Sequence, residues 1–242
     1  MSGEGLAFEH RPSDSPFVER VWRSRSRATT TMISVARAHW DFVFWEGPDG
    51  VHAGIQGPES RASRAPVPPD SEFVGIRLAL GARVRGLSMP SLVDGFLELP
   101  VEGRWFRLGA DRVRLPEFAA AEEFVAHLVR KEALVVTDVA DASVPERTRQ
   151  RRYLATIGLP QRTVQQIERA NVAAIRLRDG DGLPSAVAHE SGYFDQPHLA
   201  RSLRRFIGPS ATELAGGAER HEPLSLLYKT GPRDDRYRPG HD

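Results

Sequence analysis

Residues 183–208 have the sequence LPSAVAHESGYFDQPHLARSLRRFIG. This stretch has the pattern of a short helix, a tight turn and a second helix. Pro184 suits the first turn of a helix, where its missing N–H leaves no hydrogen bond unmade. Gly192 can adopt the left-handed conformation that ends a helix, and Asp195 is a good N-cap for the helix that follows. The sequence therefore predicts two helices joined by a turn.

The second of these helices has two different faces. Leu199, Leu203 and Phe206 follow the i, i+4, i+7 spacing of an apolar stripe. The opposite side carries Pro197, His198, Arg201, Arg204 and Arg205. A short helix anchored by one apolar stripe, with an arginine-rich outer face, suits insertion into the major groove of DNA. A solvated basic helix packed on a core gives the same pattern, so this helix alone leaves both interpretations open.

A second copy of the pattern lies upstream. Residues 143–158 align with residues 193–208, and both segments end in glycine. Repeats of this kind indicate duplicated supersecondary units. Between the copies, residues 162–178 keep apolar side chains at helical spacing, which predicts one connecting helix. We expect a further helix over residues 134–141, although this segment is rich in β-branched side chains, which are poor helix formers.

Over about residues 130–216 the chain resembles the tandem helix-turn-helix domain of the AraC/XylS family of transcriptional regulators. In the second unit the motif residues are Ala188, Gly192, Tyr193, Asp195, Gln196, His198, Leu199, Arg201, Phe206 and Gly208. In the first unit they are Arg147, Thr148, Gln150, Arg151, Arg152, Tyr153 and Gly158. The resemblance implies double-stranded DNA as the partner, with two recognition helices in successive major grooves.

The resemblance also implies which side chains read the DNA. Bases are expected to be contacted by Arg147, Gln150 and Arg151 from the first unit and by Gln196, His198 and Arg201 from the second. These residue types fit that role, because arginine pairs with guanine and glutamine with adenine in the major groove. Phosphates, which position a protein without specifying sequence, are expected to be contacted by Arg152, Arg204 and Arg205.

The first unit departs from the family pattern at Arg149. This residue aligns with Leu199 of the second unit, on the same helix face as Tyr153. We expect the stem of Arg149 to be buried and its guanidinium to reach solvent. The first unit is therefore expected to be less well packed than the second, which leaves open how much each unit contributes to recognition.

Charge and composition limit the class of protein. The chain has 242 residues, 40% hydrophobic and 27% charged, with a net charge of only +1, as in soluble globular proteins. Residues 143–207, however, hold eleven arginines against six acidic residues, the local basic charge expected of a nucleic-acid partner. The absence of cysteine excludes thiolate chemistry, including DNA-repair methyltransferases that carry an AraC-like domain. Without a recognisable signal peptide or membrane span, a cytoplasmic location is expected.

The N-terminal half has the pattern of a β-rich domain. Strands are predicted at residues 18–27, 32–38, 40–45, 51–56, 72–80, 96–99 and 105–108, with a loop over 57–70, a helical turn near 89–90 and a helix over 116–131. The half resembles the cupin-like sensor domain that precedes AraC-type DNA-binding domains. That resemblance rests on His39-Trp-Asp, Gln56-Gly-Pro-Glu59, Val67-Pro-Pro, Gly75-Ile-Arg77 and Leu92-Val-Asp-Gly95.

Two residues of this half are candidates for binding a small ligand. Trp40 belongs to an aromatic cluster that either lines a pocket or forms core. Arg77 lies inside an apolar strand and needs an anionic partner if buried. That partner is either a ligand carboxylate or a structural acid, for which the nearby choices are Glu46, Asp41 and Glu59. No His-x-His pair, nucleophile elbow or nucleotide-binding motif is present in this half, so we expect no enzyme, no metal and no cofactor.

Taken together, these patterns predict an α+β protein. Residues 1–116 would form a β-rich, cupin-like sensing or dimerisation domain. Residues 117–218 would form an all-α domain with two helix-turn-helix units joined by a linker helix, and residues 219–242 a mostly disordered tail. The predicted function is sequence-specific DNA binding in transcriptional regulation, modulated by a small ligand or by dimerisation, with RNA polymerase as a further candidate partner and no membrane partner. The alternatives are a ligand-binding or enzymatic β domain whose C-terminal half has lost DNA binding, and a general nucleoid binder.

Overall fold

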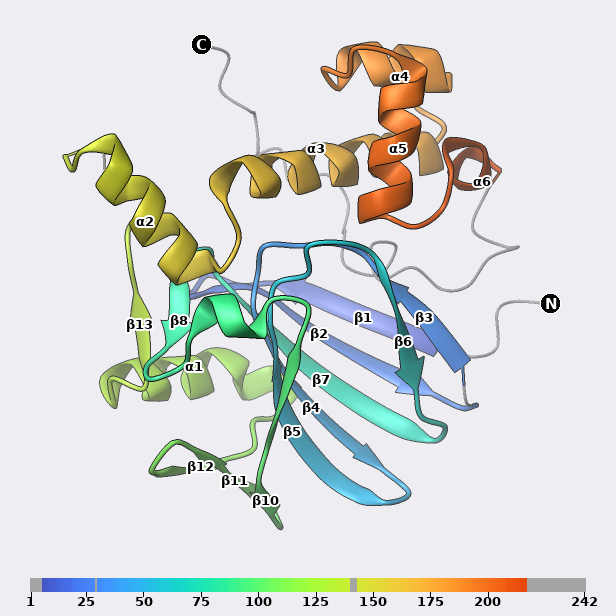
Figure 1. The fold of residues 1–242 in the computed structure, drawn as a ribbon. Helices are drawn as coiled ribbons and strands as arrows, with labels where there is room; N and C mark the ends of the chain where they lie inside the picture. Colours follow the sequence, from blue (N-terminus) through green and yellow to red (C-terminus); the bar gives the residue numbers. More distant parts are fainter. Residues whose placement is uncertain (1–5, 29, 140–142, 217–242) are drawn as a thin grey trace.

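The computed structural model describes residues 6–28, 30–139 and 143–216. The protein is mixed α/β, with strands in the first half of the chain and most helices in the second. Figure 1 shows the helical part lying above the strands. The tail predicted for residues 219–242 lies outside the described residues.

The largest sheet is antiparallel and has the strand order β1-β2-β7-β4-β5-β9. Its strands are β1 (Leu6–Pro12), β2 (Val18–Ser26), β7 (Ser71–Leu78), β4 (Asp41–Gly47), β5 (Gly50–Gln56) and β9 (Phe96–Leu99). β4 and β5 form a hairpin in which Gly47 pairs with Gly50. In the turn between them, Gly50 adopts a φ of 124° that other residues rarely adopt.

Three smaller sheets complete the β-rich part. They are β3 (Thr30–Ser34) with β6 (Ser63–Val67), β8 (Ala82–Val84) with β13 (Leu134–Val136), and β10 (Val101–Glu102) with β11 (Trp105–Leu108) and β12 (Asp111–Arg114). The predicted loop over 57–70 therefore contains a strand, β6. The helical turn expected near 89–90 is confirmed as the short 3-10 helix η1 (Met89–Leu92).

The core of the β-rich part is aromatic. Phe42 and Phe44 of β4 are buried and meet the edge of Phe124 at 5.5 and 5.6 Å between ring centroids. Phe124 belongs to α1 (Ala121–Arg130), which follows the 3-10 helix η2 (Phe118–Ala120). The helix predicted over 116–131 is therefore present, and its apolar face is buried against the strands.

The helix predicted over residues 134–141 is wrong. Residues 134–136 form strand β13, which pairs antiparallel with β8 so that Leu134 lies opposite Val84. The β-branched side chains of Val135 and Val136 favour this extended conformation. The first helix-turn-helix unit thus lacks the expected helix in the described residues before α2, and residues 140–142 lie outside the description.

The remaining helices agree with the sequence pattern. They are α2 (Glu146–Ile157), α3 (Gln161–Arg178), α4 (Pro184–Glu190) and α5 (Gln196–Phe206). A further short helix, α6 (Ala211–Ala215), is one that the sequence pattern does not predict. Gly192 has a φ of 70° in the turn between α4 and α5. The Asp195 carboxylate accepts a hydrogen bond from the His198 backbone N–H at 2.7 Å, which confirms Asp195 as the N-cap of α5.

The predicted domain boundary at residue 116 stays a prediction. The packing does show that α1 and β13 share the core of the strands. It also shows that Val35, Ala36 and Ala38 from the β-rich part enter the core of the helical part. The two parts therefore share buried surface.

An ion pair joins the first strand to α1. Arg11 Nη2 donates to Glu122 Oε2 at 2.7 Å and to the Phe118 carbonyl at 2.9 Å. The hydrogen bond from Arg11 is the main reason that the pKa of Glu122 falls from 4.5 to about 2. Because the folded-state pKa lies below the unfolded value, this contact contributes its full stability above about pH 4.5 and loses it as the pH falls toward about 2.

Replacing Glu122 with glutamine is expected to reduce the acid sensitivity of the fold. Between about pH 5 and pH 2.5 the parent chain should lose more unfolding free energy than Glu122→Gln, because only the parent takes up a proton at this site on unfolding. Urea unfolding at several pH values measures the difference. Glu123→Gln, an exposed neighbour on α1, serves as the control. Equal pH dependence in all three proteins would contradict the assignment.

Candidate nucleic-acid interface

Helix α5 is anchored by the predicted apolar stripe. Leu199 and Leu203 are fully buried and Phe206 is nearly so. Their shared core includes the α2 and α3 side chains Tyr153, Ile157, Val164, Ile167, Ala170, Ala173, Ala174 and Leu177. Because α2 and α5 both pack with α3, that helix sets how the two are placed relative to one another.

The N-terminal half of α5 presents the side chains expected to contact bases. Gln196 and Arg201 are exposed, and His198 is half-buried. The His198 and Tyr193 rings form a T-shaped contact with 5.1 Å between their centroids. Tyr193 is itself buried and donates its hydroxyl hydrogen to Ser202 Oγ at 3.1 Å. The imidazole is therefore positioned by the core, whereas the other two side chains extend into solvent.

Helix α2 presents its three predicted base-contacting residues to solvent. Arg147, Gln150 and Arg151 are all exposed. Gln150 Nε2 donates to Glu146 Oε1 at 2.7 Å, so this amide would have to release Glu146 to pair with adenine. Arg149 is half-buried and forms an ion pair with the same Glu146. Arg149 is thus partly buried and has an acidic partner that the sequence pattern did not indicate.

The arginines of the helical part differ in whether an acidic side chain neutralises them. On α3, Arg176 pairs with Glu190 and Arg178 pairs with Asp179. Within the described residues, no ion pair involves the exposed arginines Arg147, Arg151, Arg201 and Arg204. Exposed arginines without an ion pair therefore lie on α2 and α5, and one more, Arg162, lies on α3.

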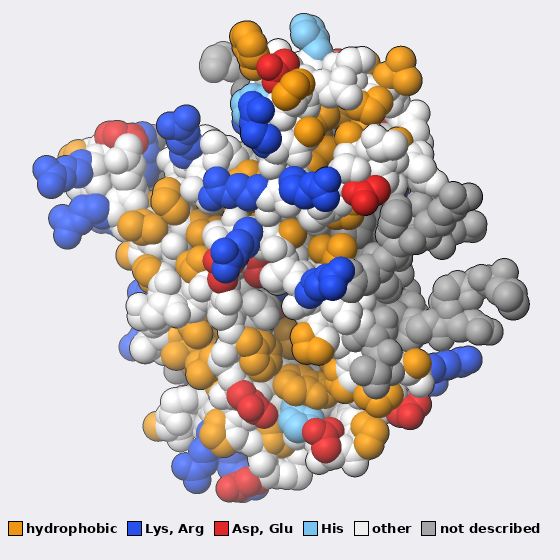
Figure 2. Space-filling view, turned by 45° about the vertical axis from the view of Figure 1, so that its right-hand side comes forward, with side chains coloured by type: hydrophobic (Ala, Val, Ile, Leu, Met, Phe, Trp, Pro, Cys, Tyr) orange, Lys and Arg blue, Asp and Glu red, His pale blue; other side chains and the backbone are white. Residues whose placement is uncertain are grey.

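Basic side chains gather on the surface of the helical part. Figure 2 shows Lys and Arg side chains gathered over the helical part, on the projecting helix at the left and on the surface beside it. The predicted phosphate-contacting residues Arg152, Arg204 and Arg205 are exposed as well. The candidate interface is therefore a basic surface carried by two helices that share one core.

The C-terminal end of α5 is held by the β-rich part. The Ala36 backbone N–H donates to the Phe206 carbonyl at 2.7 Å, and the Ala62 N–H donates to the Arg205 carbonyl at 2.9 Å. These carbonyls belong to the last turn of the helix, whose C=O groups have no N–H partner within the helix itself. Asn171 of α3 donates to the Ala36 carbonyl at 3.2 Å. No side-chain pattern marks such backbone contacts, so the sequence could not reveal them.

A buried ionic cluster fixes the segment that makes these contacts. Arg37 Nη2 lies 2.9 Å from Glu59 Oε2, and Arg37 Nη1 lies 3.6 Å from Asp41 Oδ2. Arg77 Nε donates to Asp41 Oδ1 at 3.1 Å, and its Nη2 donates to Asp41 Oδ2 at 3.4 Å. Ser34 Oγ donates to Glu59 Oε2 at 2.9 Å. Asp41 is thus the acidic partner of Arg77 among the three that the sequence left open.

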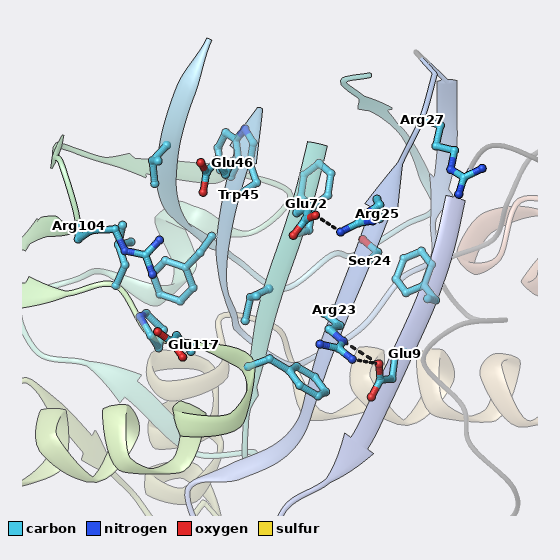
Figure 3. A pocket seen from close by; sticks show the side chains of 18 residues that line it. Glu9, Arg23, Ser24, Arg25, Arg27, Trp45, Glu46, Glu72, Arg104 and Glu117 are labelled. Carbon is cyan, nitrogen blue, oxygen red and sulfur yellow. Dashed lines mark hydrogen bonds and ion pairs between the residues drawn. The ribbon is translucent and has the colours of Figure 1, made fainter. Parts of the chain in front are cut away.

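An open cavity of about 910 Å³ lies elsewhere in the β-rich part. It is lined by Phe8, Glu9, Arg23, Ser24, Arg25, Arg27, Phe44, Trp45, Glu46, Val51, Glu72, Phe73, Val74, Arg104, Leu115, Pro116, Glu117 and Phe118. Figure 3 shows Arg104 and Glu117 across from the strands that carry Arg23, Arg25 and Glu72. Neither Trp40 nor Arg77 lines this cavity. Trp40 is buried in the aromatic core instead.

Over 6–28, 30–139 and 143–216, no group of three or more His, Cys, Asp or Glu side chains is placed to hold a metal ion. None of the helices described there is both long enough and apolar enough to cross a membrane.

No protein-family model matches the chain, and no curated protein matches it. Among solved structures, the chain is similar to the 1.65 Å structure of ToxT from Vibrio cholerae, over 87% of this chain and 98% of that chain. The sequence identity is 8% and the TM-score is 0.41. At this identity and TM-score the likeness assigns neither a family nor a function to the chain.

Proposed function

We propose that the protein is a sequence-specific DNA-binding transcriptional regulator of the AraC type. The observation that carries the proposal is the free basic charge on two helices, α2 and α5, that are packed on one linker helix. Free arginines attract the phosphate backbone and can pair with guanine. The Asp195 cap and the turn at Gly192 support the assignment of α4 and α5 as a helix-turn-helix unit, with α5 as its recognition helix.

The two helices are unequal in how they are supported. α5 follows α4 through a tight turn, and the β-rich part caps its last carbonyls. The helix expected before α2 is absent from the described residues there, and the α2 residue Arg149 occupies the position that Leu199 has in α5. We therefore assign the larger share of sequence discrimination to α5.

Replacing Arg201 with alanine is expected to cost more sequence discrimination than replacing Arg147. A good arginine–guanine pair contributes about 1–3 kcal/mol of discrimination between base pairs. Arg201 lies on α5, which is better supported by the rest of the protein than α2. The measurement is a pair of matched titrations on a preferred duplex and a scrambled duplex of equal length. Arg162→Ala, an exposed arginine on α3, controls for the loss of charge alone. Equal losses for Arg201→Ala and Arg147→Ala would contradict the unequal roles.

An effector site is the second part of the proposal. The cavity between the main sheet and residues 104 and 115–118 has the size of a small-molecule site and combines aromatic with charged side chains. We place the effector there rather than at Trp40 and Arg77, because Arg77 is already neutralised by Asp41 and Trp40 packs in core. Screening small amphipathic molecules for a rise in unfolding temperature tests this placement. A hit should lose its effect in Arg104→Ala and keep it in Arg112→Ala.

The competing function is a β-rich binding domain whose helical part no longer binds DNA. It predicts weak retention on heparin and no salt-dependent release in the range where DNA-binding proteins elute. The proposed function predicts retention, with release as salt displaces the phosphate contacts. A nucleoid binder would also be retained but would not distinguish the preferred duplex from the scrambled one.

A further inference from the structure

One aromatic side chain stands out on the helical part because it is almost fully exposed. Phe194 is 93% exposed, more than any other large hydrophobic residue in the described part of the chain. It lies in the turn between α4 and α5, directly before the cap residue Asp195. Its neighbour Tyr193 is 4% exposed. The chain therefore directs one aromatic ring into the core and the next into solvent.

The fold does not explain the identity of Phe194. A ring that is this exposed contributes little hydrophobic stabilisation, so the packing of the fold does not account for a large apolar side chain at this position. Gln196 and His198, which belong to the proposed interface, follow it two and four residues later in the chain. In helix-turn-helix proteins the N-terminal residues of the recognition helix reach the base edges. Phe194 is thus continuous with the surface expected to face the major groove.

We infer that Phe194 contacts DNA and recognises a thymine through its C5 methyl group. This inference rests on the proposed function and adds an apolar determinant to it. The thymine methyl is the one apolar group that a base pair presents in the major groove, and aromatic side chains pack against it. Arg201 and Arg204, exposed on the same helix, attract phosphates, so that the ring leaves water when the helix enters the groove.

The test combines a protein variant with a base variant. On the duplex that the parent protein prefers, thymines near the α5 block are replaced one at a time by deoxyuridine, which lacks only the methyl group. For the parent protein, one such replacement is expected to weaken binding about fourfold, as for the loss of one buried CH₂-sized group. Phe194→Ala is expected to weaken binding roughly tenfold and to remove the sensitivity to that replacement, which a double-mutant cycle detects.

Controls separate this inference from the proposed function. Leu183→Ala removes another exposed apolar side chain, 73% exposed, at the far end of α4, and should change affinity less than about twofold. A parent protein that prefers no duplex would overturn the proposed function. A parent protein that prefers one, while Phe194→Ala binds it equally well or stays sensitive to deoxyuridine, would overturn only the thymine contact. If Phe194 contacted a protein partner instead of DNA, the affinity of Phe194→Ala for the preferred duplex would likewise be unchanged.

Discussion

Replacing Asp41 with asparagine is expected to lower the free energy of unfolding by about 3–5 kcal/mol. The Asp41 side chain is fully buried and lies between two cations, Arg77 at 3.1 Å and Arg37 at 3.6 Å. Asparagine keeps the shape but removes the charge, which leaves buried guanidinium groups short of a negative partner. Chemical denaturation of the two proteins at neutral pH measures the loss.

A surface ion pair of the same sheet provides the matched control. Glu72 pairs with Arg25, and both side chains are 63% exposed. Glu72→Gln is expected to cost no more than about 1 kcal/mol, because solvent screens the pair and hydrates either partner when it is left alone. If Asp41→Asn destabilised the protein no more than Glu72→Gln, the buried cluster would not fix the segment that supports α5.

Replacing Leu203 with alanine is expected to cost about 2–5 kcal/mol of unfolding free energy. Leu203 is fully buried in the core that α2, α3 and α5 share, so its removal opens a cavity that the surrounding helices can only partly fill. The variant should also bind DNA more weakly, because α5 loses its anchor. Denaturant unfolding and titration with the preferred duplex measure the two effects.

Leu154→Ala is the control for this substitution. Leu154 lies on α2 and is 41% exposed, so its truncation is expected to change stability by no more than about 0.5 kcal/mol. Similar losses for Leu203→Ala and Leu154→Ala would mean that α5 is not anchored through its apolar stripe.

The local parts of the fold could be predicted from the sequence because their signals are local. The helix pair around residue 192 follows from a glycine, a capping aspartate and an apolar stripe within 26 residues. Strand β13 was missed because its partner β8 lies about 50 residues away, and a pairing at that distance has no local signal. The β-branched residues of β13 favour an extended segment, whereas the helix-turn-helix repeat predicts a helix at the same position.

The candidate site could be predicted only in part. All six residues expected to contact bases are at least partly accessible on α2 and α5. The acidic partner of Arg77 required knowledge of the sheet, in which β4 and β7 place Asp41 directly opposite Arg77. The cavity is assembled from strands and loops distant in sequence, so no motif pointed to it.

Selection from a pool of randomised duplexes tests the central claim most directly. Purified protein would retain duplexes at about 0.15 M salt, where specific contacts outweigh general attraction to phosphates. The account predicts enrichment of two short blocks about one helical turn apart, with the stronger block lost in Arg201→Ala. Retention without any enriched sequence, weakening only as salt rises, would contradict it.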